Sequence, residues 1–184
     1  RKNERQHTKI LDIENGRKGK MNTGKFFIKI LFFVIVFLSL GACATTLRVE
    51  KALDVETKKQ LQISEVLVTA DSYVFTSDTL LRALKSAVLS QLNAVKAQGI
   101  PAVMEIVVTR AKIVTRGRRA LMGAFGGSNI LDITATIKAA ETKNILGIYE
   151  VKGKYNPGGW GVFSDPIEST TSSVAEELVK GIYQ

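Results

Sequence analysis

The 184-residue chain has one histidine, His7, and one cysteine, Cys43, and both lie in its first quarter. After Cys43 there is therefore no imidazole for proton transfer near neutral pH and no thiol nucleophile. A lone cysteine cannot form an intramolecular disulfide, and zinc sites built on histidine or cysteine are excluded beyond residue 43. We expect no metal, no cofactor and no catalytic activity.

Carboxylates are the remaining candidates for acid–base chemistry. Asp71, Glu105 and Asp132 lie in strand patterns without a catalytic spacing, so we expect them to be solvated residues on strand faces. A Ser–Lys pair stays open as an alternative, although no motif supports it.

The formal net charge of +9 is concentrated near the start of the chain. Residues 1–43 hold nine Lys and Arg against three Asp and Glu, whereas the remainder holds 17 against 14. The part after Cys43 is thus close to balanced, which removes the charge argument for a nucleic-acid partner. We expect none.

A secretory signal is indicated between Lys20 and Cys43. A short basic segment ends at Lys29, and the 13 residues from Ile30 to Ala42 carry no charge. This run is shorter than the roughly 20 apolar residues that a membrane-spanning helix needs. An uncleaved helix over residues 26–47, with Lys29 at the interface, is the alternative.

The last residues of this segment, Leu40-Gly41-Ala42-Cys43, resemble the lipobox of bacterial lipoproteins. The resemblance implies that Cys43 is diacylated and becomes the mature N-terminus. Two acyl chains anchor a protein stably in a membrane. Ala44, where enteric lipoproteins of the inner membrane tend to have Asp, favours the periplasmic face of the outer membrane over the inner membrane.

The sequence divides into four parts. Residues 1–20 precede the first methionine, Met21, and are expected to be an upstream extension without ordered structure, with a genuine cytoplasmic tail as the alternative. Residues 21–42 would be the signal peptide. Residues 43–62 are rich in charge and are expected to form a lipid-anchored tether, with a short strand at 47–49 or a helical turn near 55–61. Residues 63–184 would form one domain.

Within that domain, strands are predicted at 63–75, 102–115, 130–140 and 145–155 from their β-branched residues and period-two alternation. A helix is expected after Ser77 as its N-cap, with Gly99 near its end. A second begins with Asp165, Pro166 and Glu168 in a capping arrangement. The order β-α-β-β-β-α predicts an α+β two-layer sandwich, with two helices on a mainly antiparallel sheet of about four strands.

An Arg- and Gly-rich connection is the most distinctive stretch of this domain. Its candidate contact residues are Arg116, Arg118, Arg119, Gly126 and Gly127. Backbone amides beside glycines can form an anion-binding nest, and Arg grips phosphate. Its glycine spacing matches neither a P-loop nor a dinucleotide fingerprint.

Two alternatives for this connection stay open. One is a simple link between strands that needs positive φ at glycine and has a solvated basic edge. The other is a protein or membrane contact through Leu121, Met122 and Phe125. Trp160, in a second glycine-rich loop, is either a cover for the core or part of the same binding surface.

The domain also resembles a family of small, uncharacterised bacterial lipoproteins. The residues that carry this resemblance are Gly126–Asn129, the strand Leu131–Ala139, the turn Glu141–Gly147, the loop Gly158–Gly161 and the last helix. Glu141 and Asn144 stand where that family usually has Asp and Gly. The resemblance implies an envelope location; its motifs are structural, and no particular activity comes with it. We expect an accessory or binding module in envelope assembly, transport or stress response, with an envelope protein as partner. The alternative is binding of an anionic lipid headgroup or glycan by Arg116, Arg118 and Arg119.

Overall fold

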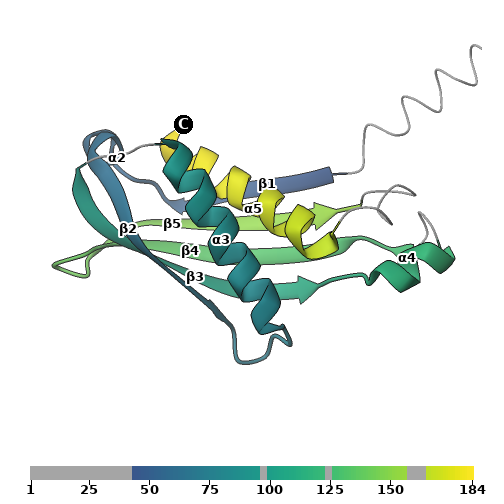
Figure 1. Cartoon of the computed structure of the whole chain (residues 1–184). Coiled ribbons are helices and arrows are strands. Elements are labelled where there is room, and N and C mark those ends of the chain that lie inside the picture. The colour runs from purple at the N-terminus through teal and green to yellow at the C-terminus, as the bar shows by residue number, and fades with distance from the viewer. Residues whose placement is uncertain (1–42, 96–98, 123–125, 157–164) are drawn as a thin grey trace, which may run out of the picture. The chain divides into compact units, whose positions relative to one another are not determined.

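The structure is a computed structural model that describes residues 43–95, 99–122, 126–156 and 165–184. Five strands and four helices lie in these ranges (Figure 1). In chain order they are β1 (Cys43–Lys51), α2 (Val55–Gln60), β2 (Leu61–Ala70), α3 (Asp78–Val95), β3 (Ile100–Lys112), α4 (Arg116–Met122), β4 (Asn129–Ala139), β5 (Ile145–Tyr155) and α5 (Pro166–Tyr183).

All five strands form one sheet in the order β1-β5-β4-β3-β2. The β1–β5, β5–β4 and β4–β3 pairs are antiparallel, whereas β2 and β3 are parallel. The expected α+β class and mainly antiparallel sheet are confirmed, but the count of about four strands and two helices was wrong. The parallel pair follows from α3, which carries the chain back to the starting end of β2 before β3 begins.

The long helices α3 and α5 lie on the same face of the sheet (Figure 1). Their buried residues, such as Leu84 and Leu178, meet inward side chains such as Met104 and Ile133 in one hydrophobic core. Along β4 the buried residues alternate with half-exposed ones, as the period-two pattern predicted. The polar face of the sheet therefore lies opposite the helices.

The expected tether over residues 43–62 was wrong. Cys43–Lys51 is an edge strand paired with β5, and α2 follows it with Asp54 as N-cap. The predicted short strand at 47–49 is part of the longer strand β1, whereas the predicted helical turn near 55–61 corresponds to α2. One face of β1 packs on α5: Leu47 lies so close to Gly181 that an added Cβ would come within 2.1 Å of it. Thr45 shares a 2.9 Å hydroxyl contact with Ser173 on the same helix.

The first predicted strand was too long, because β2 ends at Ala70 and a turn follows. Asp71 donates its N–H to the Val108 carbonyl at 3.0 Å and accepts the N–H of Val74 at 2.9 Å. After this turn the hydroxyl of Ser77 accepts the N–H of Leu80 at 3.2 Å. The predicted helix start at Ser77 is thus confirmed.

The β4–β5 connection is the tight turn that the sequence predicted around Lys143 and Asn144. Lys143 has a positive φ of 60°, and its N–H reaches the Ala139 carbonyl at 3.0 Å. The N–H of Ala139 in turn reaches the Asn144 carbonyl at 3.0 Å. These bonds close the hairpin and fix the register of β4 and β5.

Candidate functional site

One end of the sheet collects most of the residues that the sequence singled out. The strand register places Cys43 opposite Tyr155, Tyr155 opposite Asn129, and Lys112 opposite Ile130. We call this the Cys43 end of the sheet. The turn after β2, the segment between β3 and β4, and the start of α5 all lie at this end.

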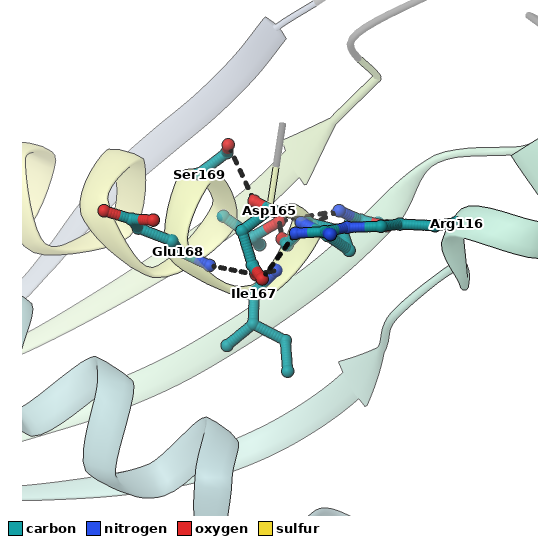
Figure 2. Close-up of polar contacts among 8 residues, drawn as sticks. Arg116, Asp165, Ile167, Glu168 and Ser169 are labelled. Atoms are coloured by element: carbon teal, nitrogen blue, oxygen red, sulfur yellow. Dashed lines mark hydrogen bonds and ion pairs between the residues drawn. The ribbon is translucent and has the colours of Figure 1, made fainter. Parts of the chain in front are cut away.

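Arg116–Met122 forms the helix α4 instead of an open loop. Arg116 reaches across to the start of α5, where its Nη2 lies 2.9 Å from Oδ2 of Asp165 (Figure 2). The two side chains are 58% and 44% exposed, so this is a surface ion pair. Pairs of this kind contribute at most about 1 kcal/mol to stability.

Asp165 is the N-cap of α5, as its position before Pro166 predicted. Its Oδ1 accepts the N–H of Ile167 at 2.9 Å and that of Glu168 at 3.1 Å (Figure 2). The N–H of Glu168, followed by that of Ile167 and by the charge of Arg116, holds the pKa of Asp165 below its ordinary value. The carboxylate thus joins α4 to the first turn of α5.

Asn129, at the start of β4, is fully buried and connects three segments. Its Oδ1 accepts the N–H of Val114 at 2.9 Å. Its Nδ2 donates to the Pro166 carbonyl at 3.1 Å and to Oγ1 of Thr170 at 2.8 Å. One amide therefore holds the exit of β3, the beginning of β4 and the N-terminus of α5 together.

The glycine-rich link before Asn129 has a positive φ at a glycine, as expected if the segment is a simple link between strands. Gly127 has a φ of +96°, and Gly126 is buried. Arg118 is exposed, while Arg116 is paired with Asp165. The Arg119 side chain, Phe125 and Trp160 lie outside the described residues.

The most exposed large hydrophobic side chains also gather at the Cys43 end. Phe75 is 100% exposed, and Tyr73 and Leu121 are each 90% exposed. Met122, beside Leu121 in α4, is 49% exposed. The sequence indicated Leu121 and Met122 as a possible contact. It missed Tyr73 and Phe75, because the stretch up to residue 75 is rich in β-branched and aromatic residues and was interpreted as strand.

The three carboxylates considered for catalysis occupy separate positions. Glu105 forms an ion pair with Lys138 on the neighbouring strand, and Asp71 caps its turn by accepting the N–H of Tyr73 at 3.2 Å. Burial raises the pKa of Asp132, against the opposing charges of Arg110 and Lys152. Because β4 alternates, Asp132 lies on the polar face of the sheet.

A groove of about 510 Å³ runs between α3 and α5 on the outer side of the helix layer. It is lined by small and hydroxyl-bearing residues with two carboxylates: Thr79, Ala83, Ser86, Ala87, Ser90, Asp165, Ile167, Glu168, Thr171 and Ser172. Among the described ranges, no helix has the length and hydrophobicity to cross a bilayer.

No family model matches the chain, and no curated protein matches it. Among solved structures, the fold is similar to a PelC dodecamer subunit from Paraburkholderia phytofirmans, with 10% identity and a TM-score of 0.49 over 76% of this chain and 97% of that one. A DUF330 protein from Xanthomonas campestris has 12% identity and a TM-score of 0.42, covering 72% and 90%. A candidate lipoprotein from Caulobacter crescentus CB15 has 11% identity and a TM-score of 0.36, covering 64% and 87%.

Proposed function

We propose that this protein is a lipid-anchored lipoprotein of the cell envelope, whose domain is a non-catalytic accessory or binding module. The acyl chains would be carried by Cys43 after cleavage between Ala42 and Cys43. Because Ala44 follows the cysteine, we propose the periplasmic face of the outer membrane as its place. The groove between α3 and α5 is the surface that we propose for an envelope protein partner.

The observation that carries this proposal is the match between the lipobox and the start of the fold. The uncharged run and Leu40-Gly41-Ala42-Cys43 predict cleavage before Cys43. That same residue, Cys43, belongs to β1, an edge strand of the sheet. Cleavage there would leave every strand and helix of the described residues intact, and would place the modified residue at the edge of the sheet.

The anionic-ligand alternative has weaker support. It needs Arg116, Arg118 and Arg119 to be available to one headgroup or glycan. Arg116 already has a carboxylate partner, Asp165, which also caps α5. A ligand at Arg116 would have to compete with that pair.

Metabolic labelling with an alkyne-tagged fatty acid tests the anchor. The full chain should incorporate the label and should fractionate with membranes. Cys43→Ser should remove the label, whereas Ala44→Ser, a neighbouring change outside the lipobox, should leave it in place. Label that persists in Cys43→Ser, or no label in the native chain, would refute the anchor.

A further inference from the structure

The position of Cys43 in the fold restricts where the domain can lie relative to a membrane. A 19-residue extended linker over residues 44–62 would have reached about 60 Å from its attachment point. Instead, Cys43 is itself in register with Tyr155 at the end of the sheet. Acyl chains on Cys43 would therefore hold the Cys43 end of the domain close to the bilayer surface.

The most exposed apolar side chains of the described residues are concentrated at the Cys43 end, which the acyl chains would hold close to the bilayer. Tyr73, Phe75 and Leu121 are exposed by 90% or more, and each belongs to a segment at the Cys43 end. At the opposite end, the most exposed large apolar residue in the described ranges is Val55, at 67%. Apolar and aromatic side chains that extend fully from a surface are typical of contacts with a membrane or a protein.

The exposed apolar residues belong to two neighbouring segments of this end, the turn after β2 and the helix α4. Phe75 lines a small hollow with Ala111 and Ile113, which end β3 and lead into α4. Leu121 is in the last turn of α4, a seven-residue helix on the same chain segment. The turn after β2 and the tip of α4 thus flank the exit of β3.

The charged side chains at this end differ between the same two segments, α4 and the turn after β2. Lys112, Arg118 and Lys154 are exposed near α4 and the ends of β3 and β5, and Arg118 precedes Leu121 by three residues, which places both on one side of α4. The turn after β2 carries Asp71 instead, and Asp78 begins the helix α3 that follows it. Basic residues beside apolar ones favour the headgroup region of an anionic bilayer, so the charge attraction would come from the α4 side.

We infer that the Cys43 end is a membrane-contact surface, on which Phe75 and Tyr73 from one turn and Leu121 from α4 enter the lipid interface at the same end of the sheet as the anchor. The occupant is the bilayer that holds the acyl chains of Cys43. This inference rests on the proposed function, since it needs the anchor at Cys43. It adds an orientation of the domain on the membrane.

Fluorescence quenching by brominated lipid tests this orientation on the full, lipidated protein. Because a lipidated Cys43 has no free thiol and the chain has no other cysteine, one introduced cysteine can be labelled alone with bimane. The variants are Phe75→Cys and Leu121→Cys, with Val55→Cys as the matched control at the opposite end. Each is reconstituted into vesicles of phosphatidylcholine and phosphatidylglycerol, with or without bromine on the acyl chains.

Bimane at Phe75→Cys and Leu121→Cys should lose most of its emission in brominated vesicles, while bimane at Val55→Cys should keep it. If the probes at both positions are quenched no more than the control while the fatty-acid label on Cys43 is present, the orientation is overturned and the anchor stands. If the label itself is absent, the anchor is overturned and the orientation with it. The label, measured on the same samples, separates the two failures.

Discussion

Replacing Asn129 with alanine should destabilise the domain strongly, although it changes a single polar residue. Asn129→Ala removes at least three hydrogen bonds, to the Val114 N–H, the Pro166 carbonyl and the Thr170 hydroxyl. Val114 is 4% exposed, so its N–H would lose its partner in a buried place. At a net contribution of about 1 kcal/mol for each hydrogen bond, the loss in unfolding free energy is about 3 kcal/mol. The cost of one buried donor left without a partner, together with the other lost contacts, gives a similar total.

Urea denaturation of the purified protein, followed by far-ultraviolet circular dichroism, measures this loss. Thr134→Ala, on the polar face of the same strand, is the matched control and should change the unfolding free energy by less than about 0.5 kcal/mol. A cycle with Thr170→Val should show coupling between Asn129 and Thr170. The reasoning is refuted if Asn129→Ala costs no more than Thr134→Ala, since the buried amide would then not hold these segments together.

Two further predictions concern the start of β3 and the cap of α5. Gly99 has a φ of +149°, and an added Cβ would lie 2.3 Å from the Gln60 carbonyl oxygen, so Gly99→Ala should cost about 2 kcal/mol or more in urea denaturation. Gly117→Ala, where a Cβ meets nothing within 4 Å in the exposed helix α4, should instead be neutral or stabilise by up to about 1 kcal/mol; equal losses would contradict this contrast. Because the pKa of Asp165 is lowered in the folded state, its carboxylate stabilises above the unfolded pKa of about 3.9, and this contribution is lost as the pH falls through the lowered pKa. The stability advantage over Asp165→Asn should therefore shrink below about pH 4 in a pH series of denaturation curves, and a constant difference would count against the cap.

The parts of the fold that sequence predicted well have a local physical signature. In β4, alternating apolar and polar residues match the burial of the strand residue by residue. At α5, Asp165 and Pro166 supply the N-cap and the first helical position, and the helix begins where they predicted. Ser77 has the same role for α3. In each case a few neighbouring residues decide the structure.

The parts that it missed depend on distant partners. β1 has few apolar residues, because only its inner face, through Leu47 and Thr45, meets α5, and its outer residues Arg48 and Glu50 are charged. An edge strand of this kind looks like a charged linker until β5 is placed beside it. The parallel pairing of β2 with β3 likewise depends on where the α3 crossover packs, which no short pattern encodes.

The candidate site was predicted in outline only. Sequence drew attention to Arg116 and to the exposed tip at Leu121 and Met122, but it could not show that Arg116 pairs with Asp165, 49 residues later. Tyr73 and Phe75 were assigned to a strand, although the turn that exposes them is set by the bond from Asp71 to Val108. Long-range hydrogen bonds, and not composition, thus decide which of these side chains reach the surface.

The most direct test of the central claim is the intact mass of the protein purified from membranes of cells that express the full chain. The account predicts a polypeptide that begins at Cys43, with a mass increased by a diacylglyceryl group and, where a third acylation follows, by one more fatty acid. Cys43→Ser should abolish both the processing and the added mass. A membrane-bound chain that retains residues 21–42 and carries an unmodified Cys43 would contradict the account and would favour an uncleaved membrane helix.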